Sequence, residues 1–244
     1  LESKLENQTD HPNPDEKKLR IHFNGPVEVV GDIPLVHKTQ VVSEYGEPIA
    51  WKREEVIPTP KAGYCLCRCG HTGDFPFCDS THNEIDFDGS EIADTSPIAT
   101  RQEVIPGGQQ ITVRRDITIC SEAGYCGLRD ATIDSLLPQS GDTRVRSLIM
   151  AMIERCPSGS YTYSILPEEP DIEPDLPVEV ALVTEITSDG PIRGPWWVTG
   201  GIPIYRSDGL RYEVRNRVTL CSCGGSKNKP FCDGTHREKA SSSK

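Results

Sequence analysis

The sequence predicts a mixed α+β protein in which two small β-rich modules flank a smaller α+β module. Three observations predict this layout. A pattern of cysteine and histidine occurs twice in the 244-residue chain, and an apolar stripe with helical spacing lies between the copies. Hydrophobic residues make up only 35% of the chain, which also has 21 glycines and 20 prolines. That composition favours small, loop-rich modules that are stabilised by more than burial.

The repeat extends well upstream of the cysteines. "GPVEVVGDIPL" (Gly25 to Leu35) and "GPWWVTGGIPI" (Gly194 to Ile204) share Gly-Pro-x-x-Val-x-Gly-x-Ile-Pro-aliphatic without a gap. Each stretch precedes its cysteine cluster, so the repeating unit is a whole module. The first copy is longer before its cysteines, which indicates an insertion at residues 41–60. Short β-type runs such as "YEVRNRVTL" predict a strand before each cluster.

The two clusters have the spacing of a metal site. "CRCGHTGDFPFCDSTH" (67–82) and "CSCGGSKNKPFCDGTH" (221–236) place three cysteines and one histidine at identical offsets. Taken alone, three thiolates and one imidazole are an ordinary ligand set for structural zinc. Reduced thiolates are favoured over disulfides, because the paired Cys-x-Cys spacing suits metal binding and no export signal is evident.

The full skeleton, Cys-x-Cys-x2-Ser/Thr-x3-Pro-x-Cys-Asp-x-Thr-His, resembles the CDGSH iron–sulfur domain family of the mitoNEET type. The resemblance implies a 2Fe–2S cluster in each copy. The second copy fits throughout, whereas the first has Ser80 where the family has glycine. We expect the backbone near His82 to differ for this reason, since serine tolerates positive φ poorly. The implied ligands are Cys67, Cys69, Cys78 and His82 for the first cluster and Cys221, Cys223, Cys232 and His236 for the second.

Local signals suggest how these ligands are presented. Pro76 and Pro230 occupy positions where a helix could begin, which would put the third cysteine and the histidine on one helical face. Asp79 and Asp233 are expected to cap these helices instead of binding metal. The nearby Cys65 has no assigned role.

The segment between the repeats carries a different cysteine pattern. Residues 106–166 resemble the divergent monocluster ferredoxins, in which Cys-x2-Ala-Gly-x-Cys pairs with a later Cys-Pro-Ser-Gly. Ala123 occupies the middle ligand position, so three thiolates remain, and we expect 3Fe–4S in preference to 4Fe–4S. The implied ligands are Cys120, Cys126 and Cys156. The preceding helical stripe is expected to be core: Val145, Leu148, Ile149, Met152 and Ile153.

These signals divide the chain into five parts. We expect a flexible tail at 1–20, a first CDGSH module at 21–95, a ferredoxin-like domain at 106–166, an acidic, proline-rich spacer at 167–179 and a second CDGSH module at 180–244. The CDGSH modules are expected to pack as an internal pseudo-dimer within a monomer.

No catalytic motif is present, so we expect a soluble electron carrier, or a redox subunit of a larger oxidoreductase, and not an enzyme in itself. The alternative function is an iron–sulfur cluster carrier or a redox or iron sensor with labile clusters. The net charge of −11 disfavours nucleic-acid binding and favours redox partners with a basic docking surface. No apolar run could cross a bilayer, so no membrane association and a cytoplasmic location are expected.

Overall fold

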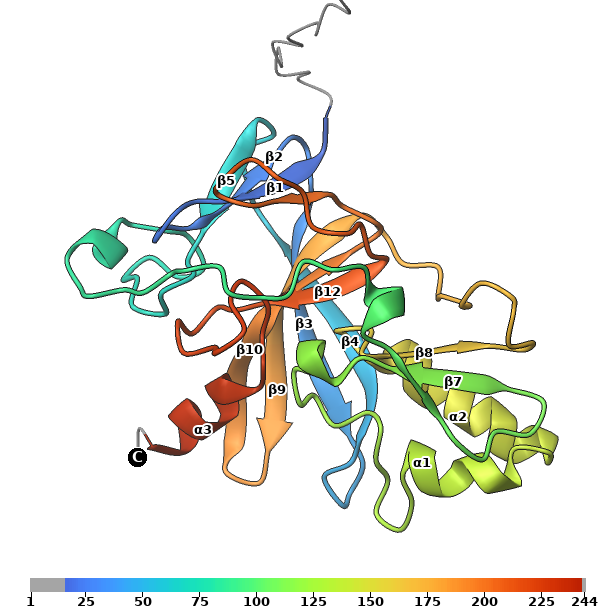
Figure 1. The fold of residues 1–244 in the computed structure, drawn as a ribbon. Helices are drawn as coiled ribbons and strands as arrows, with labels where there is room; N and C mark the ends of the chain where they lie inside the picture. The colour runs from blue at the N-terminus through green and yellow to red at the C-terminus, as the bar shows by residue number, and fades with distance from the viewer. Residues whose placement is uncertain (1–15, 243–244) are drawn as a thin grey trace, which may run out of the picture.

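The computed structural model describes residues 16–242, which form a sheet-rich α+β fold with few helices (Figure 1). One sheet has the order β11 (Ile204–Tyr205), β1 (Lys18–Ile21), β2 (Val27–Val30), β5 (Gly63–Leu66). A second has the order β12 (Arg217–Leu220), β10 (Gly190–Thr199), β9 (Glu179–Thr187), β3 (Leu35–Val42), β4 (Pro48–Ile57). A third, smaller sheet consists of β6 (Glu103–Ile105), β7 (Thr112–Arg115) and β8 (Tyr161–Ser164).

Each of the two larger sheets is built from both copies of the repeat. The repeated Gly-Pro segment leads into β2 or lies within β10, the repeated Ile-Pro precedes β3 or β11, and β5 or β12 leads into the cysteines. β3 pairs in parallel with β9 of the other copy, with Leu35 opposite Val180. β11 in turn pairs in parallel with β1, with Leu19 opposite Ile204. The second copy therefore contributes β11 to the four-stranded sheet, and the first copy contributes β3, followed by β4, to the five-stranded sheet.

The largest hydrophobic core joins the two copies. Leu19 and Leu66 from the first copy and Trp196 and Leu220 from the second are all fully buried in it. The Trp196 indole Nε1 donates a hydrogen bond to the carbonyl oxygen of Cys67 at 2.8 Å. Since each copy supplies part of this core, neither copy has a complete core by itself. Apolar burial, the main driving force of folding, therefore joins the two copies.

The predicted insertion in the first copy forms β4, whose counterpart in the second copy is only an isolated bridge between Tyr205 and Arg211. β4 lies at an edge of the five-stranded sheet and contacts the middle of the chain. Trp51 Nε1 donates to the carbonyl oxygen of Arg155 at 3.1 Å, and the Tyr125 hydroxyl donates to that of Ala50 at 2.7 Å. The insertion thus connects the first copy of the repeat to the unit that lies between the two copies in the sequence, which is called the inserted unit below.

The inserted unit has its own core between the three-stranded sheet and α2 (Thr143–Arg155), at the lower right of Figure 1. Ile149, Met152 and Ile153 are buried as predicted, whereas Leu148 is 36% exposed. β6 pairs with β7, so the unit begins before residue 106. The remaining helical segments are η1 (Thr81–Asn83), η2 (Ile98–Thr100), η3 (Ile117–Ile119), α1 (Ile133–Leu136), η4 (Leu137–Gln139) and α3 (Thr235–Ser242).

Two predicted flexible segments differ from expectation. The predicted tail was extended too far, because β1 begins at Lys18 and pairs with two strands; residues 1–15 lie outside the described residues. The acidic segment is not a free spacer, because Asp171 pairs with Arg114 at 2.6 Å and Glu173 with Arg217 at 2.9 Å. These arginines offset the mutual repulsion of the carboxylates. No helix among residues 16–242 is long and apolar enough to span a membrane.

A buried ion pair connects β3 of the first copy with β9 of the second, and its loss should destabilise the fold. Lys38 Nζ on β3 lies 2.8 Å from Glu179 Oε1 on β9, and their side chains are 8% and 3% exposed. We expect Lys38→Met to lower the free energy of unfolding by about 3 kcal/mol, because it leaves a buried carboxylate with less compensation. The exposed Lys52–Glu54 pair provides the control, and Lys52→Met should cost less than about 1 kcal/mol in urea unfolding. Equal losses in the two variants would contradict this account.

Candidate metal centres

The first site consists of two pairs of candidate metal ligands, called donor pairs below. β5 leads into Cys67 and Cys69, which are buried with their sulfur atoms 3.6 Å apart. The following loop supplies Cys78 and His82, with the sulfur 3.3 Å from the imidazole Nδ1. The two pairs are neighbours, since Cys67 acts electrostatically on Cys78 and raises its pKa, after the larger effect of burial.

The second site repeats this arrangement after β12. The Cys221 and Cys223 sulfurs are 3.9 Å apart, and the Cys232 sulfur lies 3.4 Å from Nδ1 of His236. Cys221 acts electrostatically on both Cys223 and Cys232. In both copies the outer nitrogen, Nε2, is therefore the one that faces away from the cysteine.

The loop between the two pairs does not form the predicted helix. Pro76 and Pro230 follow cis peptide bonds and do not begin a helix, which starts only at Thr81 and Thr235. Thr72 donates its hydroxyl to the carbonyl oxygen of Phe77 at 2.7 Å, and Ser226 makes the matching bond to Phe231 at 2.6 Å. Each bond closes a compact turn around the proline. The third cysteine therefore precedes the helix, and only the histidine lies in it.

The aspartates after the third cysteine hold this turn. Asp79 accepts hydrogen bonds from the N–H groups of Thr81 at 3.0 Å and Gly73 at 2.7 Å. Asp233 accepts the equivalent bonds from Thr235 at 3.0 Å and Lys227 at 2.7 Å. The bond from Thr81 is the main reason that the pKa of Asp79 lies well below its usual range. These bonds hold the turn before the helix, but the N-cap of the first helix is Ser80, with no side-chain cap bond, so the predicted capping role is wrong for Asp79.

Ser80 does not change the backbone, contrary to expectation. Its φ is 74°, in the left-handed region, and the equivalent Gly234 has a φ of 90°. The hydrogen bonds of Asp79 on both sides fix the turn, so the serine adopts the conformation that the turn requires. A non-glycine residue in that region costs about 1–2 kcal/mol.

The two sites differ in exposure. Cys78 and His82 of the first site are half-buried, whereas Cys232 and His236 of the second are 2% and 3% exposed. The Nε2 atom of His236 also lies 3.2 Å from Oε2 of Glu185, a fully buried carboxylate. The third cysteine and the histidine are therefore more exposed in the first site than in the second.

The loops of the two sites are in direct contact. A β-carbon added to Gly70 would lie 2.8 Å from the carbonyl oxygen of Cys223, and one added to Gly224 would collide with that of Cys69. Both glycines have positive φ, at 84° and 73°. Only glycine allows this approach. The two candidate centres are therefore adjacent.

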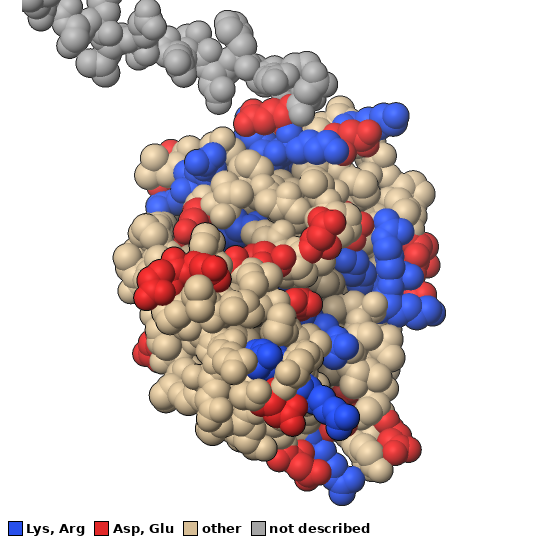
Figure 2. Space-filling view, turned by 90° about the vertical axis from the view of Figure 1, so that its right-hand side faces the viewer, with Lys and Arg blue, Asp and Glu red and all other residues tan. Residues whose placement is uncertain are grey.

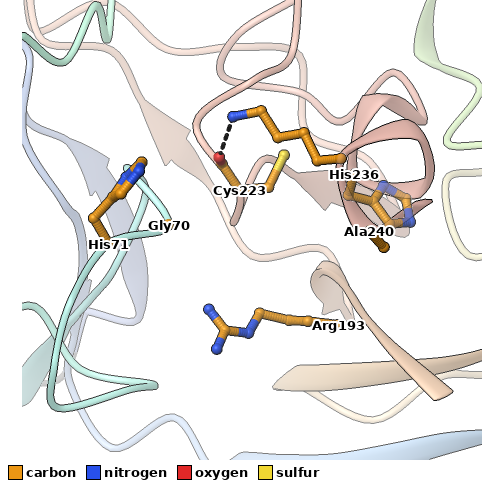
Figure 3. Close-up of a pocket in the computed structure, with 7 residues that line it drawn as sticks. Gly70, His71, Arg193, Cys223, His236 and Ala240 are labelled. Carbon is orange, nitrogen blue, oxygen red and sulfur yellow. Dashed lines mark hydrogen bonds between the residues drawn. The ribbon is translucent and has the colours of Figure 1, made fainter. Parts of the chain in front are cut away.

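Residues beside this contact were not identified from the sequence. Figure 3 shows Gly70 and His71 on one side of a cavity, Cys223 and His236 on the other, and Arg193 extending between them. The positive charge of Arg193 lies close enough to Cys67 for the two to interact electrostatically. His71, set aside in the sequence, contacts the carbonyl oxygen of Cys69 through Nδ1 at 2.8 Å. Nothing in the sequence pattern indicated these placements.

The residue between the first two cysteines of each site makes an equivalent hydrogen bond in both copies. Arg68 Nε donates to the carbonyl oxygen of Gly25 at 2.8 Å, and the Ser222 hydroxyl donates to that of Gly194 at 2.7 Å. The two acceptors are the equivalent glycines of the repeat, so the sequence repeat did indicate that this contact is shared by both copies. The bonds fix the Cys-x-Cys segment against the neighbouring strand.

The three cysteines of the inserted unit are neighbours. Cys120 follows η3, Cys126 lies in the next loop, and Cys156 ends α2. Burial, followed by Cys156 and Cys126, raises the pKa of Cys120 to about 11. Among residues 16–242, no three side chains of His, Cys, Asp or Glu surround one point as a single metal ion would require. Cys65 lies in β5 and contributes its carbonyl oxygen to the Cys78 N–H.

The paired sites have features that suit an anionic cluster. Gly70 donates its N–H to the Cys67 sulfur at 3.3 Å, and Gly225 donates to the Cys223 sulfur at 3.4 Å. Burial raises the pKa of Cys69 to about 11 and also raises the pKa values of Cys78 and Cys232, so these three thiols would stay protonated without a cationic centre. Metal binding would release those protons. The donor sets therefore fit an iron–sulfur cluster held by the residues named above.

Comparison with known families agrees with this chemistry. Residues 24–83 and 193–237 match the family described as iron-binding zinc finger, CDGSH type. The protein therefore carries two CDGSH-type regions, and the predicted duplication is confirmed. The segment with Cys120, Cys126 and Cys156 lies outside both matches, so its ferredoxin-like character stays a prediction. The chain has no match among curated proteins or among solved structures.

Relief of the strain at Ser80 should stabilise the protein. We expect Ser80→Gly to raise the free energy of unfolding by about 1 kcal/mol, the left-handed penalty less the entropy that glycine adds to the unfolded chain. Gly46 has a φ of 82° with nothing within 4 Å of an added β-carbon, so Gly46→Ser is the control. It should lose a similar amount. Urea unfolding would measure both, and a destabilised Ser80→Gly variant would contradict the assignment of strain.

Proposed function

We propose that the protein transfers single electrons and carries two His-ligated 2Fe–2S clusters and one 3Fe–4S cluster. The observation that carries the proposal is the division of each CDGSH donor set into two neighbouring pairs. In a 2Fe–2S cluster each iron takes two protein ligands, and bridging sulfides supply the rest, so two pairs suit two irons. Such clusters supply one-electron chemistry when bound.

The side chains around the two sites would set the properties of the clusters. Arg193 is close to Cys67, and Arg68 is close to Cys221, so each anionic centre has a guanidinium nearby. A positive charge favours electron addition and raises a potential. The hydrogen bond of Trp196 to Cys67 and the contact of Gly70 with Cys223 hold the two sites at a fixed separation.

We also propose that the two CDGSH modules form an internal pseudo-dimer. Reciprocal exchange of β3 and β11 supports it, because equivalent strands change places between the two sheets. The contacts of Gly70 with Cys223 and of Gly224 with Cys69 relate the two cluster loops in the same reciprocal way.

The 3Fe–4S assignment rests on the environment of Ala123. This residue is 5% exposed, and its carbonyl oxygen accepts a hydrogen bond from Gln40 Nε2 at 2.9 Å. An alanine side chain offers no ligand, so Cys120, Cys126 and Cys156 would be the available thiolates. This site lies beside the second CDGSH site, because a β-carbon on Gly234 would lie 2.6 Å from the Glu122 side chain.

An acidic surface beside the more exposed first site favours a basic redox partner. The carboxylates of Asp74, Asp79, Glu84 and Asp86 are exposed around Cys78 and His82. The chain has no lysine or arginine between Arg68 and Arg101. On the face drawn in Figure 2, by contrast, acidic and basic side chains are interspersed. Complementary charge would steer a basic partner to the first site. All ten cysteines are free, which favours a reducing compartment such as the cytoplasm.

The exposure of the first site also favours the second candidate function, donation of a cluster or sensing of iron. A half-buried His82 leaves one edge of the site accessible to an acceptor or to water. Reversible reduction with both clusters retained supports electron transfer, whereas transfer to an apo-acceptor protein supports the carrier function.

Metal and sulfide analysis of anaerobically purified protein tests the proposal. We expect seven iron atoms and eight inorganic sulfides per chain, which is the sum of two 2Fe–2S clusters and one 3Fe–4S cluster. The measured numbers should agree with these to within about one atom. The oxidised protein should give the EPR signal of a 3Fe–4S cluster, and reduction should add two 2Fe–2S signals. A colourless protein with stoichiometric zinc would contradict the proposal.

A further inference from the structure

The second CDGSH site carries an extension that the first lacks. Val27 and Trp196 occupy the same position of the repeat, directly after Gly-Pro. Ile21 lies opposite Val27 in the β1–β2 hairpin and Leu182 lies opposite Trp196 in the β9–β10 hairpin, so these two pairs are equivalent. In the first copy the chain then turns directly towards Gly25. In the second copy the strands continue until Thr187 lies opposite Gly190. The extra length lies beside α3, as Figure 1 shows.

Glu185 lies on this extension and faces the second site. Its side chain is fully buried, with Oε2 3.2 Å from His236 Nε2 and in contact with Arg237. Among the described residues, its other oxygen, Oε1, has no hydrogen-bond partner, and neither has Nε2 of His236, so the contact between Oε2 and Nε2 is a close approach of charge-bearing groups and not a hydrogen bond. The repeated Gly194 leaves room for it, since a β-carbon there would lie 3.3 Å from Glu185 Cγ. The fold thus buries a carboxylate at the outer nitrogen of a candidate ligand.

We propose that Glu185 is a positioning residue that holds His236 towards the second cluster and lowers the potential of that cluster. The inference rests on the proposed function. A carboxylate at the outer nitrogen fixes the ring of a ligating histidine and strengthens it as a donor. Negative charge nearby also disfavours the addition of an electron. The second cluster should therefore be held more firmly than the first.

The first copy provides the matched comparison. Its hairpin carries Glu28, whose Oε2 lies 3.1 Å from Nε2 of His22, a half-exposed histidine outside the ligand set. Glu28→Gln therefore removes a carboxylate from a histidine in the equivalent hairpin without touching a ligand.

Four variants separate charge from support: Glu185→Gln, Glu185→Ala, Arg237→Met and Glu28→Gln. Glu185→Gln should raise the midpoint potential of the second cluster, because it removes the negative charge. The cluster should be retained, because glutamine has nearly the same shape as glutamate and keeps one oxygen that can accept a hydrogen bond. Glu185→Ala should raise the potential and also release that cluster about tenfold faster. Arg237→Met leaves the carboxylate uncompensated and should lower the potential. Glu28→Gln should change neither property.

The opposite shifts expected for Glu185→Gln and Arg237→Met are the decisive readout, because a merely structural role would move both in one direction. Pulsed EPR in a His82→Cys background would isolate the nitrogen coupling of His236, and Glu185→Gln should alter it. Unchanged coupling and potential in both Glu185 variants, with the parent coupling present, would overturn this inference alone. Absence of any histidine coupling in the parent would overturn the proposed ligation, and this inference with it.

Discussion

The reciprocal exchange of β3 and β11 is the constraint on which the rest of the structure depends. Each strand completes the sheet of the other copy, so the two modules cannot fold around separate cores. The shared core then fixes the separation of the cysteine-bearing strands, β5 and β12. With those strands fixed, Gly70 lies against the backbone of Cys223, and Gly224 lies against that of Cys69. The closeness of the two candidate centres is thus a consequence of strand pairing far from them.

The same scaffold supports two different sites. The sulfur–nitrogen distances are nearly equal in both copies, yet Cys78 and His82 are half-buried whereas Cys232 and His236 are buried. The difference arises outside the motif, in hairpin length and in the charges that accompany it. The two copies of the duplicated fold therefore give their candidate ligands two different environments. Buried groups near a metal ligand are an effective means of making that distinction.

The sequence was sufficient for features that depend on local spacing. Identical offsets predicted both sets of candidate ligands, and the repeated Gly-Pro and Ile-Pro segments defined the module whose duplication the family comparison confirms. The helix 143–155 followed from its apolar period. The insertion at residues 41–60 was also apparent from the unequal length of the copies and corresponds to β4.

Features that depend on contacts between distant segments could not be predicted. Parallel pairing of β3 with β9 is decided by a shared core, and no local pattern encodes the partner strand. The expected helix at Pro76 was wrong because the Thr72 hydroxyl closes a turn there, and propensity alone does not include that bond. Glu185 looked like any strand carboxylate, since its role appears only when the hairpin is placed over His236.

Native-state hydrogen exchange would test the central claim, that the exchanged strands make one cooperative unit of both copies. Amides of β3 and β9, which pair across the copies, and of β1 and β2 should exchange only through global unfolding and report one common free energy. Exchange of the four-stranded sheet at a clearly lower free energy than the five-stranded sheet would mean that the copies open independently, and would contradict the account.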